Sequence, residues 1–386
     1  MSFLIMAGQR AWRGNGSKGK SEEVHSPFIR DYIERRERQR DLRAWTSGGD
    51  DHPSAFGRSM TWGGRGLPIE EVEVQYQDAA PDGQGGFYYA VNFGRVGGLF
   101  HQNARGDERR LFHRDSFVCD GMAFQPGNNR FVVAFGGDHG MTYLALLDEN
   151  GRQDQWLTEG DCADARPSWD PARPNVVLYQ TSGLARGAGG RVVRAPWEVM
   201  ELDLDKGETT PLWRRDGIDM LLPRRDGAGR LYALARPNGS APVSLLEYAR
   251  GVVSIPWVLA QAVFGFANAF SYMFAQKPLW RAGGPEEKVD SPPAVRVLGK
   301  QLETAALQSG KKKGGGQPSL APSSWQLWRR DPDGSEHRLA DGVSWFALGA
   351  DGTPYYSTGL AIHACRENGV ETVYEGTLME AFMPLG

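Results

Sequence analysis

Short apolar strands and polar turns alternate along most of the chain, and their order repeats. From about residue 71 onward, a strand runs into a turn with Pro or Gly and then into a second apolar strand, as in QYQDAAPDGQGGFYYAV, DGMAFQPGNNRFVVAF, ARPSWDPARPNVVLYQ, IDMLLPRRDGAGRLYAL and VSWFALGADGTPYYS. Each turn has one anchoring residue, and the anchors are Pro81, Pro126, Pro171, Pro223, Gly349 and Pro384. The first two steps between anchors are each 45 residues, the length of one four-stranded propeller blade.

A second hairpin follows within every complete unit. TYLALLDENGRQDQWL and WQLWRRDPDGSEHRLA each place an Asn-Gly or Asp-Gly turn between two strands, which is a strong hairpin signal. Each unit therefore supplies four strands. The 50 glycines and the aromatic content of 11% also fit many tight turns between short strands that bury large rings. The sequence predicts an all-β propeller.

The number of blades depends on how the ring closes. EAFMPLG, at the last anchor, starts a sixth unit without further strands of its own, and a ring must close to leave no exposed edge. We expect residues 1–70 to supply strands through SFLIMAG and RSMTWGG, which flank a helix-like run with Ser26 as N-cap and Pro27 at its first position. Six four-stranded blades are predicted, and five blades plus a clasp are the alternative.

Two units are longer than the others. The third contains LARGAGGRVVRAP and the fourth contains residues 238–324, both between the second and third strands of the unit. In a blade that meanders outward from the axis, these loops open on the face that also carries the connections between blades. We therefore predict an N-terminal extension at 1–70 and a propeller at 71–386. A hydrophobic helix and a linker, at 238–324, are inserted in the fourth repeat.

Two phrases in the repeats carry a resemblance to a known family. PSWDPARPNVVLYQTSG and AFQPGNNRFVVAF resemble the PSWSPDGKRIAF phrase of the TolB-like, WD40-like (PD40) family of bacterial propeller repeats. The resemblance covers about residues 71–386 apart from the fourth-repeat insertion. It implies a propeller that serves as a docking platform, a ligand binder or an appendage of a peptidase. The chain departs from the family where Gly-Asn or Ala-Arg replaces Asp-Gly in two turns, and where the fourth blade is split.

The fourth-repeat insertion contains the strongest functional signal. Residues 251–276, GVVSIPWVLAQAVFGFANAFSYMFAQ, form a 26-residue stretch without a charge. A bilayer crossing needs about 20 apolar residues, so the length would suffice. However, strands of the same blade precede and follow the segment, and both of its ends must lie on one side. We expect it to lie in the membrane interface, to dip in and return, or to pack on protein.

A helix over this segment would be amphipathic, with small and polar residues on one face and large apolar residues on the other. We assign docking to Trp257, Leu259, Val263, Phe266, Phe270, Phe274 and Trp280. Trp residues at its ends suit the boundary between lipid tails and headgroups. We therefore predict a non-catalytic scaffold or accessory subunit that docks on a membrane or a membrane-embedded complex and binds other protein subunits. The alternatives are a helix that caps the propeller's own core and a soluble protein–protein adaptor.

Three carboxylates form the candidate ligand site. Asp120, Asp164 and Asp216 each lie six or seven residues before an anchor, at the expected mouth of the channel, where they could hold a cation. The favoured interpretation is that they bond to turn backbone and fix neighbouring blades. A soluble propeller enzyme or a small-ligand or cation binder that uses these carboxylates is the alternative function.

Other catalytic motifs are weak or absent from the sequence. GNGSKGKS, residues 14–21, fits the spacing of a phosphate-binding loop. We interpret it as a polar loop that binds no nucleotide, because no strand leads directly into it and Pro27 follows too soon for the required helix. There is no Gly-x-Ser-x-Gly elbow, and the seven histidines form no close ligand pair. We predict no catalytic residue, no cofactor and no bound metal.

Composition narrows the partners and the compartment. A net charge of −3 provides no general attraction for nucleic acid, so none is predicted as a partner. Cys119, Cys162 and Cys365 are far apart, which favours free thiols in a reducing compartment. The N-terminal apolar run has five residues and is too short for a secretory signal. The predicted location is the cytoplasm, peripheral to the membrane.

Overall fold

The computed structural model describes twelve stretches of the chain. They are residues 2–7, 10–15, 21–47, 74–93, 96–115, 117–137, 140–186, 192–238, 294–303, 319–366, 368–376 and 378–385. The chain divides into two compact units, Asn238–Ala294 and the remainder, and nearly all of the described residues belong to the remainder. The fold described below is that of this larger unit.

The larger unit consists of antiparallel sheets that each follow a meander. Four-stranded sheets are formed by β4 (Val74–Pro81), β5 (Phe87–Phe93), β6 (Val96–Gln102) and β7 (Glu108–Asp115); by β17 (Ile218–Arg225), β18 (Leu231–Pro237), β21 (Gln326–Arg330) and β22 (Glu336–Asp341); and by β23 (Trp345–Leu348), β24 (Pro354–Ser357), β25 (Ala361–Arg366) and β26 (Gly369–Glu375). These meanders match the repeated units of the sequence.

A nine-stranded sheet contains two further meanders. One comprises β8 (Cys119–Gln125), β9 (Arg130–Gly136), β10 (Thr142–Leu147) and β11 (Gln153–Trp156), and the other comprises β12 (Cys162–Trp169), β13 (Val176–Arg186), β15 (Glu198–Asp203) and β16 (Glu208–Trp213), with β14 (Val192–Arg194) paired to β13. A single parallel pair, Thr142 with Ala163, joins the two meanders. The LARGAGGRVVRAP insertion therefore contributes the end of β13 and the short strand β14.

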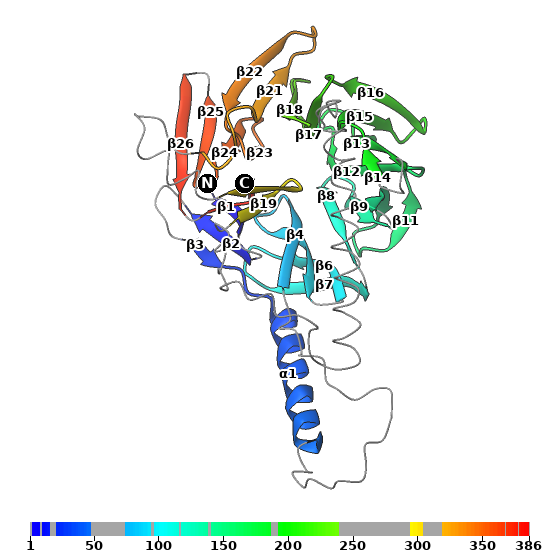
Figure 1. Ribbon diagram of the computed structural model, residues 1–386, viewed down its shortest axis with the longest axis vertical. Helices are drawn as coiled ribbons and strands as arrows, with labels where there is room; N and C mark the ends of the chain where they lie inside the picture. Colours follow the sequence, from blue (N-terminus) through cyan, green and yellow to red (C-terminus); the bar gives the residue numbers. More distant parts are fainter. Residues whose placement is uncertain are drawn as a thin grey trace, which may run out of the picture. The chain divides into compact units, whose positions relative to one another are not determined.

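The first strands of the meanders contact one another in series. β4 contacts β8, β8 contacts β12, β12 contacts β17, β17 contacts β23, β23 contacts β27 (Ala381–Pro384), and β27 contacts β4. We call these the inner strands, and Figure 1 shows the sheets of this unit arranged around them. The all-β propeller predicted from the sequence is confirmed.

One turn chemistry recurs in the hairpins. Asp226 Oδ1 accepts hydrogen bonds from the N–H groups of Ala228 (3.0 Å) and Arg230 (2.9 Å), and Gly229 adopts a left-handed φ of 81°. Side chains of Asp and Asn form such bonds readily, and Gly tolerates positive φ without steric cost. Equivalent pairs of bonds form in the turns that begin at Asp82, Asn103 and Asp148. The repeated Gly-containing turns of the sequence thus fix the hairpins.

The last sheet joins the two ends of the chain. β27 pairs with β1 (Ser2–Ala7), which continues through β2 (Arg10–Asn15) to β3 (Ser21–Glu23). The segment SFLIMAG therefore provides β1, whereas RSMTWGG lies outside the described residues. Helix α1 (Pro27–Ser47) follows, and Ser26 caps it because its Oγ accepts a hydrogen bond from the N–H of Ile29 at 3.2 Å. The ring of Phe28 packs against Phe93 and attaches the first turn of α1 to the sheet.

The fourth-repeat insertion separates two strands that pair directly. β18 and β21 are antiparallel neighbours, with Ala235 opposite Gln326, although residues 238–325 lie between them. Within this interval the structure has a strand pair, β19 (Ala294–Val297) and β20 (Lys300–Glu303). The prediction of only a linker after the hydrophobic segment was wrong at this point. Leu298 and Gly299 form the turn with positive φ values of 48° and 77°.

Candidate functional site

The ends of the insertion are held together on the propeller. Arg236 and Pro237 close β18, and Leu298 and Lys300 belong to the β19–β20 hairpin. Arg236 Nη1 donates to the carbonyl oxygen of Leu298 at 2.8 Å, and Lys300 Nζ donates to the carbonyl oxygen of Pro237 at 2.9 Å. We call these four residues the stem. The end of β18, where the chain leaves the propeller, is thus hydrogen-bonded to the β19–β20 hairpin, where the chain returns.

A buried ion pair supports the stem. Arg236 Nε lies 3.0 Å from Asp219 Oδ2, and the two side chains are only 6% and 5% exposed. The guanidinium also stacks on the Trp325 ring, 5.1 Å from its centroid, where a cation is attracted to the π face. Burial lowers the pKa of Arg236, and its attraction to Asp219 opposes that shift. Asp219 therefore stabilises the positive charge of Arg236, which donates one of the two hydrogen bonds of the stem.

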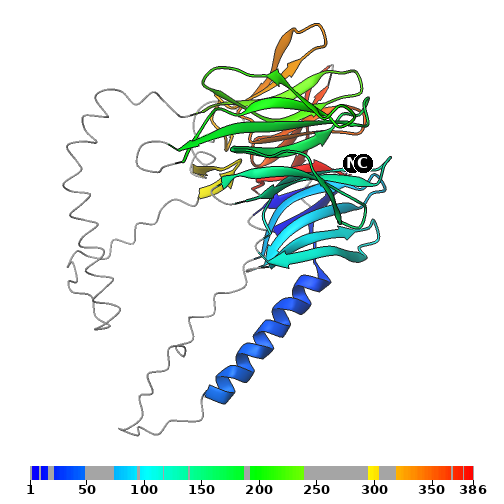
Figure 2. The ribbon, with the colours of Figure 1, turned by 90° about the vertical axis from the view of Figure 1, so that its right-hand side faces the viewer.

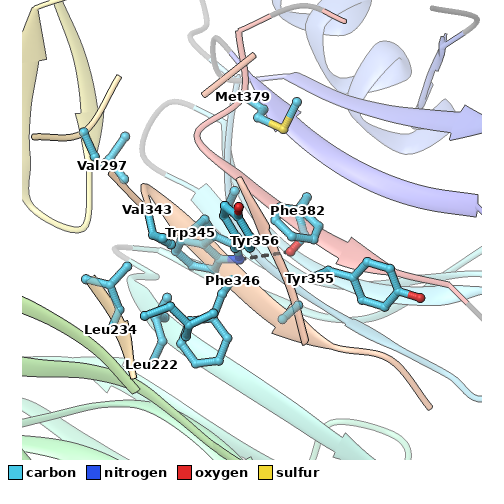
Figure 3. Close-up of a cluster of buried hydrophobic side chains, with 14 of the residues drawn as sticks. Leu222, Leu234, Val297, Val343, Trp345, Phe346, Tyr355, Tyr356, Met379 and Phe382 are labelled. Carbon is cyan, nitrogen blue, oxygen red and sulfur yellow. Dashed lines mark hydrogen bonds between the residues drawn. The ribbon is translucent and has the colours of Figure 1, made fainter. Parts of the chain in front are cut away.

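The β19–β20 hairpin is anchored by apolar side chains. Val297 and Leu302 are buried in one hydrophobic cluster with Leu234, Val343 and Trp345, which come from β18 and the β23 region. Figure 3 shows Val297 facing Val343 and the other residues of this cluster. Full burial of a Val or Leu side chain contributes about 1.5–3 kcal/mol. The return end of the insertion is therefore packed on the propeller, and Figure 2 shows the hairpin, coloured yellow, beside the sheets.

The predicted docking residues lie outside the part of the chain that the structure describes. This applies to Trp257, Leu259, Val263, Phe266, Phe270, Phe274 and Trp280. Within the described ranges, no helix combines the length and the apolar character needed to cross a bilayer.

The three candidate carboxylates lie in different environments. Asp120 lies 3.3 Å from Arg166, and Asp164, which is 2% exposed, accepts hydrogen bonds from the Thr181 hydroxyl at 2.5 Å and from the Cys162 thiol at 3.4 Å. The Asp216 side chain is 98% exposed. Among the described residues, no group of three or more His, Cys, Asp and Glu is placed to hold a metal ion. The structure therefore does not bring these carboxylates together.

A charged group lies on four inner strands, and of its members only Asp120 was a candidate in the sequence. It comprises Asp78 on β4, Asp120 on β8, Arg166 on β12 and Arg224 on β17, which we call the inner cluster. Arg166 lies 3.4 Å from Asp78 as well as 3.3 Å from Asp120, and its guanidinium lies over the Trp345 ring at 5.2 Å. Burial raises the pKa of Asp78, and the charge of Arg166 opposes that rise. These residues are far apart in sequence, so only the fold unites them.

The phosphate-loop-like segment takes part in a hairpin. Gly14 on β2 pairs with Ser21 on β3, and the strands are antiparallel. The expectation that no strand leads into this segment was wrong, because β2 runs to Asn15. A phosphate-binding loop instead needs a helix whose N-terminal N–H groups face the anion. Here Ser21 begins the strand β3, where a phosphate-binding loop would have a helix.

Comparisons with known proteins match the chain through its fold. TolB from Acinetobacter baumannii covers 99% of this chain with a TM-score of 0.50 and 9% identity, and the chain spans 66% of the TolB length. A putative TolB from Agrobacterium tumefaciens covers 81% of this chain and is matched over 86% of its own, with a TM-score of 0.45 and 13% identity. A chain of a nidogen/laminin complex covers 99% and is matched over 97%, with a TM-score of 0.49 and 8% identity.

The first of these matches supports the fold alone, since its sequence identity is low. The resemblance to TolB-like propellers, first suggested by the repeated phrases, is confirmed at the level of the fold. No protein-family model matches the sequence, and no curated protein matches it. The function must therefore be argued from the chain's own residues.

Proposed function

We propose that this protein is a non-catalytic propeller scaffold that docks on a membrane, or on a membrane-embedded protein complex, through residues 251–276. The observation that carries the proposal is the stem. Two hydrogen bonds, Arg236 to Leu298 and Lys300 to Pro237, hold the start and the return of the insertion at one place on the propeller. The insertion that contains the uncharged 26-residue stretch thus starts and ends on a folded platform.

The stem restricts how the uncharged stretch can meet a bilayer. Because both ends of the excursion are fixed to one site, a single crossing would place one end on the wrong side. A segment that lies in the interface, or that dips in and returns, satisfies this restriction. Its aromatic residues Trp257, Phe266 and Phe270, together with Trp280 just beyond its end, suit such a position or an apolar surface on a membrane protein.

The rest of the molecule suits a platform for other subunits. We propose that it has six blades, with the sixth closed by β27, β1, β2 and β3, and the series of contacts between inner strands supports this count. Five blades plus a clasp would be the alternative description of the same closure. A rigid ring presents loops and strand edges to partners, and the TolB-like fold is compatible with a protein-interaction role. We place the protein in the cytoplasm at the membrane surface.

Membrane fractionation of cells tests the proposal directly. One variant replaces residues 239–293 by a short Gly-Ser linker and keeps the β19–β20 hairpin. A matched control replaces residues 304–318 by a similar linker and keeps the hydrophobic stretch. Circular dichroism verifies that each purified variant is folded. We expect full-length protein and the control to sediment with membranes and the first variant to stay soluble.

Point variants then distinguish the effect of the apolar side chains from the effect of the length of the insertion. Replacing Phe266, Phe270 and Phe274 by Asp keeps the length of the insertion but removes its apolar face, so it should release the protein from membranes. Flotation with liposomes of neutral and anionic lipid distinguishes lipid from a protein receptor. If full-length protein is soluble in cells, or if the 239–293 replacement still sediments, the proposal is wrong. Full-length protein that is soluble but binds a soluble partner would indicate the adaptor function.

A further inference from the structure

The inner cluster places two arginines on neighbouring strands at the centre of the sheets. Arg166 lies in a β-bulge of β12, where the register to β13 shifts between Ala165 and Ser168. Arg224 follows the corresponding register shift in β17, between Leu221 and Arg224. Bulges redirect side chains, and they are frequent next to functional sites. β12 and β17 contact each other, so the bulges bring both guanidinium groups into one region.

Among the described residues, Arg224 has fewer hydrogen-bond partners than its guanidinium has donors. A guanidinium carries five N–H donors. Within the described part of the chain, Arg224 donates one hydrogen bond, to the carbonyl oxygen of Pro223 at 2.8 Å, and no carboxylate lies within 4.0 Å of it. Arg166 is closer to carboxylates, since its Nη1 lies 3.4 Å from Asp78 Oδ1 and its Nη2 lies 3.3 Å from Asp120 Oδ1. Arg224 is thus the less compensated cation.

The electrostatic environment of Arg224 favours an additional anion. Burial lowers the pKa of Arg224 to about 10; attraction by Asp78 opposes this shift, and repulsion by Arg166 adds to it. Both arginines are partly buried, and two cations held near each other there repel more strongly than they would in bulk solvent. An oxyanion between them would offset the repulsion and accept charge-assisted hydrogen bonds from the planar forks.

We propose that Arg166 and Arg224 form a binding site for a carboxylate or phosphate oxyanion, with Asp78 and Asp120 holding Arg166 in position. This site is independent of the hydrophobic stretch and of membrane docking. The anion has two sources that share this chemistry, a free small molecule and the terminal carboxylate of a peptide. Arg224 provides the free donors, and the Trp345 ring supports the face of Arg166.

Isothermal titration calorimetry on the full-length protein tests the site with inorganic phosphate and with succinate at constant ionic strength. We expect saturable binding, and we expect Arg224→Gln to weaken it by about tenfold to a hundredfold, the effect of losing charge-assisted hydrogen bonds. Arg224→Lys keeps the charge without the fork and should bind with intermediate strength. Arg366→Gln, which removes an exposed arginine of β25 paired with Glu371 of β26, is the matched control and should bind as the original protein does.

Two peptides of the same sequence, one with a free terminal carboxylate and one amidated, identify the source of the anion. Tighter binding of the free-acid peptide than of succinate or phosphate indicates a peptide tail, and equal or weaker binding indicates a small molecule. No described carboxylate pairs with Arg224 and would lose its partner, so the Arg224 variants should fold, and circular dichroism verifies this. No saturable binding of either anion, or unchanged binding by folded Arg224→Gln, would overturn the proposal.

Discussion

Removing the negative charge beneath the stem should destabilise the protein strongly. In Asp219→Asn the amide oxygen can still accept the hydrogen bond from the N–H of Trp197, which lies 3.2 Å from Asp219 Oδ1. The Arg236 guanidinium, however, loses its only carboxylate within salt-bridge distance among the described residues. Breaking a buried pair by removing one partner costs about 3–5 kcal/mol. Because Arg236 keeps Leu298 and the Trp325 ring, we expect about 3 kcal/mol.

Two further variants distinguish the contribution of the hydrogen bond from Trp197 to Asp219 from that of the Asp219–Arg236 ion pair. Asp219→Ala also removes the acceptor of the Trp197 N–H, which adds about 1–3 kcal/mol for an unsatisfied buried donor. The double variant Arg236→Met with Asp219→Asn removes both charges and keeps that acceptor. Apolar replacement of a buried ion pair is often neutral or stabilising. The double variant should therefore recover most of the stability lost in Asp219→Asn.

Urea-induced unfolding, followed by far-UV circular dichroism at pH 7, measures these free energies. The slope of the free energy with urea should remain unchanged, since the surface exposed on unfolding is similar. Limited proteolysis reports the stem itself, because a weakened Arg236 contact should speed cleavage near the β19–β20 hairpin. A loss of under about 1 kcal/mol in Asp219→Asn would contradict this prediction, since removing one partner of a buried ion pair costs about 3–5 kcal/mol.

Three other measurements test the packing of the sheets. Gly98→Ala should lower the free energy of unfolding in urea by about 2–3 kcal/mol, because its Cβ would lie 2.3 Å from the carbonyl oxygen of Phe112. The control Gly183→Ala, whose Cβ would have nothing within 4 Å, should be neutral or slightly stabilising. Equal effects of the two substitutions would contradict this prediction. Burial lowers the pKa of His363 below 6.5, so its contribution to stability is present above pH 6.5 and is lost as the pH falls through the folded-state pKa, by at most about 1.4 kcal/mol per pH unit. His363→Gln should flatten this dependence between pH 8 and pH 5, and an unchanged profile would refute the assignment. Burial raises the pKa of Cys365 to about 11, so a thiol reagent at pH 8 should label it slowly in folded protein and quickly in urea; rapid labelling without urea would refute the burial.

Much of the fold could be predicted because its signals are local. The turn at Asp226 and Gly229 needs only five consecutive residues to set its bonds and its positive φ. Ser26 caps α1 through a residue three positions away. Repetition also predicted that RLYALARP and WQLWRR are neighbours, and β18 and β21 pair in that way across the insertion.

The candidate sites depend on contacts between sheets, which no local pattern encodes. Arg166 and Arg224 are separated by 58 positions, and each looks like an ordinary polar residue beside a strand. The β19–β20 hairpin was missed because its turn places Leu298 at a φ of 48°, which is unusual for a bulky residue. Burial of Val297 against distant residues stabilises that hairpin, and the surrounding Gly- and Pro-rich sequence concealed it.

Because β1 pairs with β27, the sheet that contains both strands can be completed only at the end of synthesis on the ribosome. Met6 and Ala381 are partners in this pair and lie 375 residues apart. At about 5–20 residues per second, β1 waits roughly 20–75 s for the strand that completes its sheet. During that interval one edge of an apolar strand, SFLIMA, is open to any other extended chain. Slower translation or crowded polysomes should therefore favour aggregation of nascent chains, and early pairing of β1 with β2 leaves only one edge for a chaperone to protect.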